Sequence, residues 1–218
     1  MRRRQWVKTV LAALAAVGVN RRRDSLAAPA EVKLPDDSPV QVFDFEAGGI
    51  EGWTTVAGQW VVEEMADAPS GKKVLVQRAT KNEFNVTVAP GSYADVDVSM
   101  KFRPISGRED ASGGIIVRFN DARYYVVRAN ALEDNVRFYR VVKGKREQLA
   151  GTNTKVATNT WHTLGLKAEG DRFTVSYDGS ELFTARDATF GEPGKVVLWT
   201  KADSVTYFDS LMIRSLPE

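Results

Sequence analysis

The stretch from Gly113 to Val142 constrains the fold more than any other part of the chain. Its pattern predicts three antiparallel strands joined by two short polar loops, residues 120–122 and 131–134. The strands are rich in Ile, Val, Tyr and Phe, and the loops carry Asn and Asp, which tolerate turn geometry. Burial of one apolar side fixes the register of such strands. The stretch therefore predicts a β-meander with one side in a core.

The two faces of this predicted meander differ in chemistry. The expected register sets Arg118 opposite Tyr124, and Gly114 opposite Arg128. The face expected in the core carries Ile115, Val117, Phe119, Tyr125, Val127, Val136 and Phe138. The other face carries three guanidinium groups and two phenols, at Arg118, Tyr124, Arg128, Arg137 and Tyr139.

This arginine–tyrosine face is a candidate ligand surface. Aromatic rings stack on the apolar faces of sugars, and arginines donate planar pairs of hydrogen bonds to hydroxyls or carboxylates. We expect Asn130, Trp199 and Lys201 to extend this surface. In the alternative hypothesis the arginines pair with acids on neighbouring strands and the tyrosines cover the sheet. The residues alone leave both hypotheses open.

Residues 1–30 have the features of an export signal and are set apart from the fold. A basic head precedes a moderately apolar segment, residues 9–19, which is too short to span a bilayer as a helix. The small residues at 27–30 offer a cleavage site. The sequence RRQWVK from Arg3 resembles the twin-arginine signal, although Arg2 stands where Ser or Thr is usual. The alternatives are an ordinary secretory leader and a basic tail that stays attached.

Removal of this segment reverses the sign of the net charge. The chain has 30 basic and 28 acidic residues, of which residues 1–30 hold seven and one, so the mature chain carries 23 and 27. A net charge of about −4 argues against nucleic acid as a partner, because nucleic-acid binding needs a large positive surface. We expect a periplasmic or extracellular protein with no stable membrane span in the mature chain. Its oligomeric state is open.

The residue types also limit the metal and catalytic chemistry. The chain has no cysteine, so it has no disulfide framework and no cysteine-ligated metal. Its single histidine, His162, excludes a multi-histidine zinc site within one chain and disfavours a Ser-His-Asp triad.

The rest of the chain continues the β pattern. Residues 31–40 are predicted as a linker, and residues 41–218 as one sandwich domain. Besides the meander, strands are predicted at 41–46, 58–63, 73–78, 84–88, 94–103, 161–168, 172–177, 181–185, 195–200 and 205–214. Many short strands at this spacing indicate an all-β protein, a two-sheet antiparallel sandwich or jelly roll.

A series of short motifs covers about residues 41–214: FDFE…GW, GGIIVRF, DARYYVVRANALEDNVRFY, WHTLGL, DRFTVSYDG and WTKADSVTYFD. Their order resembles the concanavalin A-like lectin/glucanase jelly roll. Within that fold, the chain is most similar to the bacterial 3-keto-disaccharide hydrolase-type domain of unknown function, which is family-16 glycoside hydrolase-like. The resemblance implies two curved antiparallel sheets, with sugars bound on the concave face where they are bound at all.

The resemblance gives little support for a catalytic role. Family-16 glucanases carry the motif ExDxxE, whereas this chain has Asp95 and Asp97 without the closing glutamate. Glycoside hydrolysis needs two carboxyl groups about 5–10 Å apart. The resemblance also implies that the two ends of the domain come together. Asp44 and Asp209 lie on the first and last strands, and they are candidate ligands for a structural Ca²⁺, which prefers oxygen donors.

The sequence therefore predicts an exported carbohydrate-binding jelly roll without an evident catalytic apparatus. One alternative is a hydrolase or lyase acting on a disaccharide or a 3-keto-glycoside. The other is a structural or interaction module.

Overall fold

The computed structural model describes residues 39–47, 49–78 and 83–217. The predicted export signal and residues 31–38 of the predicted linker lie outside the described residues. Within the described part, the chain forms strands, turns and irregular segments but no helix, so no helix there is long and apolar enough to cross a membrane. The predicted all-β class is confirmed.

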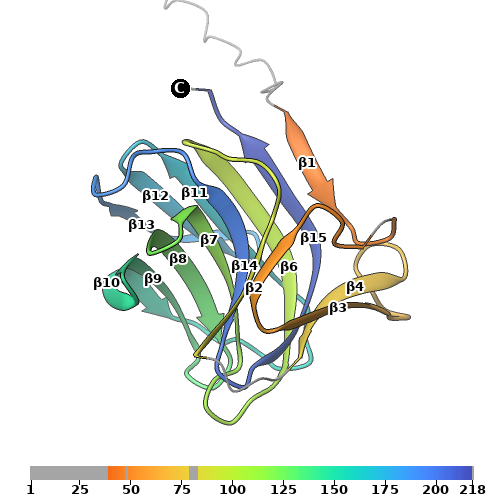
Figure 1. Cartoon of the computed structure of the whole chain (residues 1–218). Helices are drawn as coiled ribbons and strands as arrows, with labels where there is room; N and C mark the ends of the chain where they lie inside the picture. Colours follow the sequence, from red (N-terminus) through yellow and green to blue (C-terminus); the bar gives the residue numbers. More distant parts are fainter. Residues whose placement is uncertain (1–38, 48, 79–82, 218) are drawn as a thin grey trace, which may run out of the picture. The chain divides into compact units, whose positions relative to one another are not determined.

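The described strands fall into two antiparallel sheets that pack as a sandwich (Figure 1). Sheet A has the order β13-β12-β11-β6-β15-β4-β3, with β1 also paired to β15, and sheet B has the order β10-β9-β8-β7-β14-β5-β2. The strands are β1 (Val40–Phe43), β2 (Thr54–Ala57), β3 (Gln59–Glu64), β4 (Lys73–Arg78), β5 (Phe84–Val88), β6 (Val96–Ser106), β7 (Ser112–Asn120), β8 (Arg123–Asn130), β9 (Asn135–Val142), β10 (Lys145–Asn153), β11 (His162–Glu169), β12 (Arg172–Tyr177), β13 (Ser180–Arg186), β14 (Lys195–Lys201) and β15 (Val205–Ser215).

The core lies between the two sheets. Sheet A contributes alternate residues of β6 and β11, and sheet B contributes the apolar side of the meander β7-β8-β9. The meander residues in this core are Ile115, Val117, Tyr125, Val127, Ala129, Val136 and Phe138. Each buried aliphatic or aromatic side chain stabilises the fold by about 1.5–3 kcal/mol, which fixes the side of each strand that faces inward.

Two observed strands, β2 and β10, were not predicted, and both form edges of sheet B. Strand β10 is mostly exposed and polar, and β2 has four residues, three of them exposed. Neither carries the apolar alternation that marks a half-buried strand. Backbone pairing to β9 and β5 holds them in the sheet.

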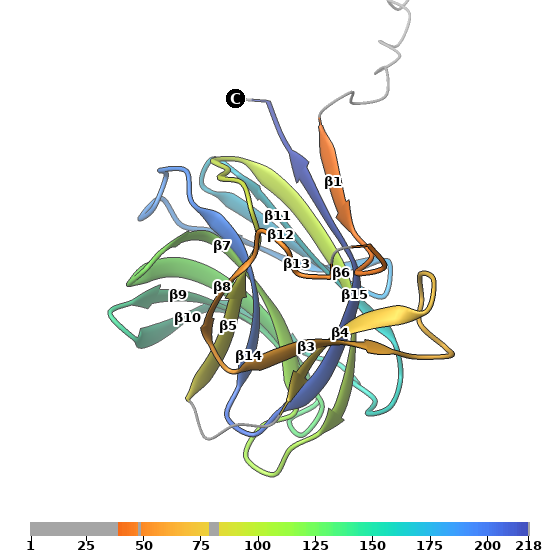
Figure 2. The same ribbon diagram turned by 45° about the vertical axis from the view of Figure 1, so that its right-hand side comes forward.

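The outer face of sheet B is strongly concave (Figure 2). Strands β10 and β5 are five ladder steps apart, which would separate them by about 24 Å in a flat sheet. Yet the Arg146 guanidinium on β10 lies 5.1 Å from the centroid of the Tyr139 ring on β9 and 5.7 Å from that of the Phe84 ring on β5. The sheet therefore curls into a trough that Arg146 spans.

Candidate functional site

Four neighbouring strands, β9, β8, β7 and β14, form the centre of the trough. Gly114 on β7 pairs with Arg128 on β8 and with Trp199 on β14, and Arg128 pairs in turn with Arg137 on β9. A Cβ at Gly114 would lie 2.9 Å from the Trp199 ring and 3.5 Å from Arg128 Cβ. Only glycine therefore leaves room for these two large side chains to flank it.

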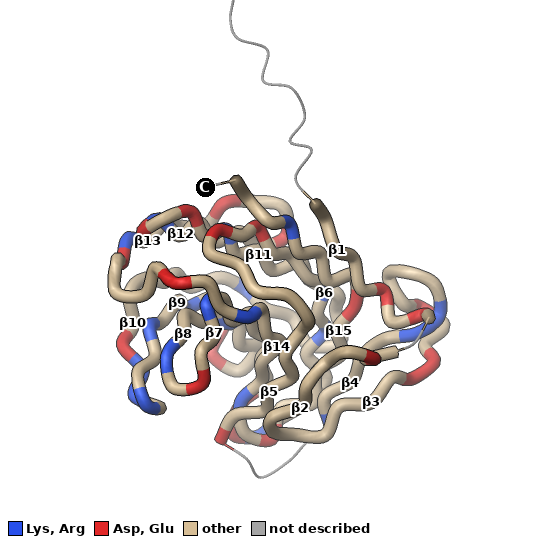
Figure 3. The backbone as a smooth tube through the Cα atoms, turned by 45° about the horizontal axis from the view of Figure 1, so that its top comes forward, with Lys and Arg blue, Asp and Glu red and all other residues tan. Residues whose placement is uncertain are grey.

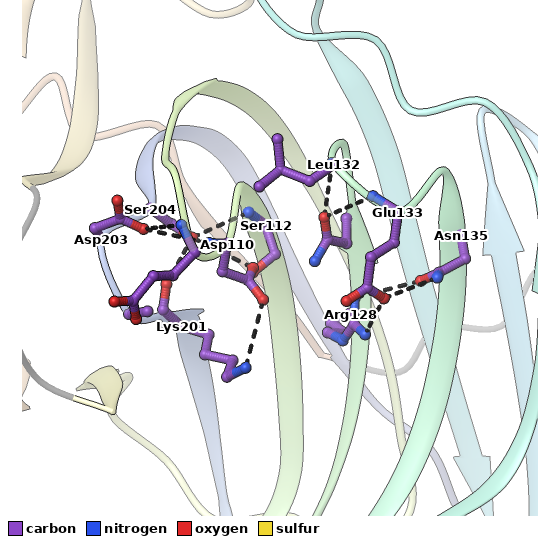
Figure 4. Close-up of polar contacts among 12 residues, drawn as sticks. Asp110, Ser112, Arg128, Leu132, Glu133, Asn135, Lys201, Asp203 and Ser204 are labelled. Carbon is purple, nitrogen blue, oxygen red and sulfur yellow. Dashed lines mark hydrogen bonds and ion pairs between the residues drawn. The ribbon is translucent and has the colours of Figure 1, made fainter.

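One end of the trough holds a set of ionisable and amide side chains that we call the polar cluster (Figure 4). Its members are Asp110, Arg128, Glu133, Asn135 and Lys201. Arg128 Nη2 donates to Glu133 Oε2 at 2.8 Å, and Asn135 Nδ2 donates to the same oxygen at 2.9 Å. Lys201 Nζ lies 3.9 Å from Asp110 Oδ2, which is longer than a hydrogen bond. The two acids and two bases balance in charge.

Two turn motifs position the acids of the polar cluster. The Asp203 carboxylate accepts hydrogen bonds from the backbone N–H groups of Arg108, Glu109 and Asp110 at 2.7, 3.0 and 3.2 Å. Asn130 Oδ1 accepts from the N–H groups of Leu132 and Glu133 at 2.8 and 3.2 Å. Asp and Asn side chains commonly fix turns in this way. The loops before β7 and after β8 thus hold Asp110 and Glu133 beside Arg128.

Burial and pairing shift the pKa values of the two acids of the cluster in opposite directions. Burial raises the pKa of Asp110, whose side chain is only 2% exposed. Hydrogen bonds from Arg128 and Asn135 lower the pKa of Glu133, whose side chain is 51% exposed. Burial alone would lower the pKa of Arg128, but its contact with Glu133 raises it. Arg128 is therefore a fixed cation beside one shielded and one open carboxyl group.

Three buried nitrogen donors around the polar cluster have no hydrogen-bond partner among the described residues. They are Arg128 Nε, Asn130 Nδ2 and Trp199 Nε1. The Asn130 amide orientation follows from the two N–H groups that its oxygen accepts, so its NH₂ group is the unpaired end. Buried donors normally find an acceptor. These three atoms are themselves buried, so they mark an unusually polar interior beside the trough and not donors that face solvent.

The structure gathers most of the predicted ligand residues. Arg128, Asn130 and Lys201 lie in or beside the polar cluster, and the Arg128 guanidinium lies 5.9 Å from the centroid of the Tyr139 ring. Trp199 and Arg137 flank Arg128 across the sheet, and Arg137 Nη2 donates to Asn153 Oδ1 at 2.7 Å. Tyr124 belongs to an apolar cluster on the same outer face, with Ile116, Val126, Val141 and Val197. Trp199 is a member of the same apolar cluster and Tyr139 packs against it, whereas the Tyr124 ring packs on the Phe119 ring.

The predicted placement of Arg118 on this face is wrong. A bulge interrupts the β7-β8 pairing between Val117 and Asn120, and Arg118 has a left-handed φ of 51°. The bulge reverses the alternation of side chains. Arg118 consequently turns towards the edge of the core, where its guanidinium lies 5.3 Å from the centroid of the Phe173 ring, and Phe119 packs on the outer face. The predicted pairing of Arg118 with Tyr124 is wrong for the same reason.

Three members of the polar cluster were missed from the sequence: Asp110, Glu133 and Asn135. Asp110 and Glu133 lie in loops, where no periodicity fixes the direction of a side chain. Asn135 begins β9 and pairs with Asn130. The alternation of β9 could have placed Asn135 on the same face as Arg137, and this was the one available signal.

Asp44 and Asp209 make protein contacts instead of forming a visible ligand set. Asp209 is buried, and its carboxylate accepts from Ser70 N at 2.7 Å and from Ser70 Oγ at 2.6 Å. Asp44 Oδ1 accepts from Glu46 N at 3.1 Å. The described residues contain no group of three or more histidine or acidic side chains arranged for a metal, and Ca²⁺ takes six to eight oxygens. The Ca²⁺ site stays a prediction.

Asp95 and Asp97 lie apart from the polar cluster. Asp95 Oδ1 accepts from Arg118 Nη2 and from Gly170 N. Asp97, on β6 of sheet A, pairs in register with Lys167 and Arg214. Neither aspartate contacts Arg128 or Lys201, so the acids near the glucanase-like pattern do not reach this site.

The chain is similar to several known proteins, although no family model matches it. It is 30% identical over 143 residues to a levanase of Bacillus subtilis (strain 168), a match that covers 65% of this chain. The chain spans only 20% of the length of that levanase.

Solved structures share the fold at low sequence identity. The carbohydrate-binding module CBM66 from Bacillus subtilis superposes with a TM-score of 0.66 at 23% identity, covering 75% of this chain and 96% of the module. A β-glucanase of Bacillus licheniformis superposes with a TM-score of 0.60 at 12% identity, covering 84% of this chain and 100% of the glucanase. A Bacillus subtilis protein of unknown function with a galectin-like fold superposes with a TM-score of 0.59 at 11% identity, covering 78% of this chain and 91% of that protein. The chain therefore has the jelly-roll fold of the concanavalin A-like lectins and glucanases.

Proposed function

We propose that this protein is an exported, non-catalytic carbohydrate-binding domain whose ligand lies at the polar cluster. One observation carries the proposal: a charge-balanced set of two acids and two bases, of which Glu133 and Lys201 are partly exposed, lies on the concave face of the sandwich. Two similar proteins, a levanase and a carbohydrate-binding module, support the same ligand class by their names.

The geometry suits the hydroxyl groups of a neutral sugar. A hydroxyl both donates and accepts, so it can bridge an ammonium and a carboxylate group. Lys201 Nζ lies 3.9 Å from Asp110 Oδ2, beyond hydrogen-bond distance, so the ammonium group of this partly exposed lysine keeps donors for a ligand. Glu133, which is half exposed, offers an acceptor beside Arg128. Tyr139 lies against Arg128 and supplies an aromatic edge.

Binding on such a surface is expected to be weak, with a dissociation constant of about 0.1–1 mM, or about 4–5.5 kcal/mol. The test is titration of the chain with levan, the polymer for which the levanase is named, and with a β-glucan. Lys201→Met and Glu133→Gln should each weaken binding at least tenfold. The melting temperature should stay within about 2 °C for Lys201→Met and fall by several degrees for Glu133→Gln, because the buried Arg128 then loses its charged partner. Lys167→Met, on sheet A, is the matched control and should bind like the native protein. Equal affinity of all four proteins would refute the site.

A second function, glycoside hydrolysis, has one specific observation in its favour. Asp110 and Glu133 have pKa values shifted apart, one upwards and one downwards. Such a difference separates the roles of general acid and ionised carboxylate. Incubation of the purified chain with levan or a 3-keto-glycoside tests this function. Release of sugar that is lost in Asp110→Asn would establish the enzyme, and binding without turnover would exclude it for that substrate.

A further inference from the structure

We propose that the turn between β9 and β10 forms a second binding site, which accepts the anionic groups of an acidic polysaccharide. We call this site the basic hairpin and define it by Arg140, Val142, Lys143, Lys145, Arg146 and Glu147. It lies at the opposite end of β9 from Asn135 of the polar cluster, seven residues or about 23 Å along the strand. It does not depend on sugar binding at the polar cluster.

The charge of the mature chain is divided unevenly. Residues 123–146 contain seven basic and two acidic residues, whereas the rest of the chain after residue 30 contains 16 basic and 25 acidic residues. Figure 3 shows several Lys and Arg positions around β8, β9 and β10. A local excess of five positive charges in an otherwise acidic protein creates a field that attracts anions to this side.

The basic hairpin holds cations that no acid of the described part neutralises. Arg140 is paired, because it contacts Glu147 at 2.5 Å and Asp187 at 2.7 Å. Lys143, Lys145 and Arg146 form no ion pair with any described residue. Arg146 lies over the Tyr139 and Phe84 rings and faces the trough. The paired Arg140 thus fixes the base of the hairpin, and Lys143 and Lys145 remain available to an external anion.

These cations surround a hollow and are held by a rigid turn. The hollow has a volume of about 450 Å³, within the range of small-ligand sites. Lys143 and Gly144 have φ values of 49° and 76°, as a tight two-residue turn requires. Lys143 N also donates to Ala122 O at 2.7 Å, which ties the turn to the β7-β8 loop. The lysines are therefore presented on an ordered backbone.

The composition of the hollow selects among anionic partners. None of its lining residues is aromatic, and Arg146 covers the nearby Tyr139 and Phe84 rings, so the hollow offers no open ring on which single-stranded nucleic acids could stack. Two free lysines are fewer than the four to eight cations that mark binding to anionic lipid surfaces. A polysaccharide carrying one carboxylate or sulfate on each sugar matches a small hollow with a few cations. The ligand class that we propose for the basic hairpin is thus a sugar chain that carries anionic groups.

The test is affinity electrophoresis of the whole chain in gels that contain polygalacturonate, with dextran sulfate and neutral dextran as further arms. The test variant is Lys143→Asn with Lys145→Gln, because asparagine tolerates the left-handed φ at position 143. We expect a loss of about fivefold in affinity for each lysine, or about 25-fold together, since one cation near an anionic surface contributes about 1 kcal/mol. Salt at 0.5 M should strongly weaken the binding of the native protein to polygalacturonate. The double substitution should leave the affinity for levan unchanged.

The matched control is Lys155→Ala with Lys167→Ala, which removes the same charge from two lysines that pair with Asp134 and Glu169. This control should keep native affinity for polygalacturonate. Equal losses in both double variants would reduce the effect to net charge and overturn the site. Unchanged binding by the hairpin variant would overturn it as well. So would native binding to phosphatidylglycerol vesicles without binding to either acidic polysaccharide.

Discussion

Replacement of Arg118 by methionine should destabilise the fold without touching a ligand site. The Arg118 side chain is 1% exposed, and its guanidinium holds separate segments of the chain together. Nη1 donates to Phe190 O at 2.7 Å, Nη2 to Gly170 O at 2.8 Å and to Asp95 Oδ1 at 3.0 Å, and Nε to Ala94 O at 3.0 Å. Methionine fills similar volume but leaves all four acceptors without this donor.

The expected loss follows from the burial of these acceptors. Breaking a buried, hydrogen-bonded ion pair costs about 3–5 kcal/mol. Asp95 is 21% exposed, so water compensates part of its loss, and we expect about 3 kcal/mol. With an m-value of about 2 kcal/mol per molar urea, the unfolding midpoint should fall by about 1.5 M. Urea unfolding followed by tryptophan fluorescence measures this shift.

Arg123→Met is the matched control for this prediction. The Arg123 side chain is exposed, forms no ion pair with the described residues and lies over the Phe190 ring at 5.7 Å. Its replacement should cost less than about 1 kcal/mol. A shift for Arg118→Met no larger than that of the control would refute the structural role of Arg118. A loss of levan binding at unchanged stability would instead restore Arg118 as a ligand residue.

Three further predictions concern the loops and the polar cluster. Gly194→Ala should lower stability by about 2 kcal/mol or more, because its Cβ would lie 2.5 Å from the Arg118 backbone carbon; Gly191→Ala meets nothing within 4 Å and should be nearly neutral in the same urea assay. Burial raises the pKa of Asp203, but backbone hydrogen bonds, among them those from Arg108, Glu109 and Asp110, outweigh it and lower the pKa. The contribution of Asp203 to stability is therefore full above about pH 5 and is lost as pH falls through the folded pKa. The stability gap between native protein and Asp203→Asn should therefore close between pH 5 and pH 2, and a constant gap would contradict this. The Asp110 pKa is raised by burial, so its ionisation opposes folding as pH rises through the folded value. Asp110→Asn should weaken levan binding without lowering the melting temperature at pH 7. A lowered melting temperature would contradict the conclusion that ionised Asp110 opposes folding.

Strand alternation accounts for what the sequence predicted correctly. In β8 the alternate residues Tyr125, Val127 and Ala129 enter the core, and Arg128 and Asn130 face the trough, as expected. Strand alternation predicted the wrong face for Arg118 because a bulge adds a residue there, and no sequence pattern indicated the bulge. It also failed for β10, whose exposed polar sequence carries no period at all.

The acids of the polar cluster show why the rest of the site could not be predicted. Asp110 and Glu133 reach Arg128 through turns that Asp203 and Asn130 fix, and the link from Asp203 to Asp110 joins residues 93 positions apart. Such contacts are set by how the β6-β7 and β14-β15 loops meet in space, and no local pattern encodes that meeting. Asn130 and Asp203 are therefore positioning residues, whose changes should act on binding through the placement of Glu133 and Asp110. Asn130 is fully buried and its Oδ1 holds the loop, so Asn130→Ala should weaken levan binding by releasing Glu133 and should also lower the melting temperature.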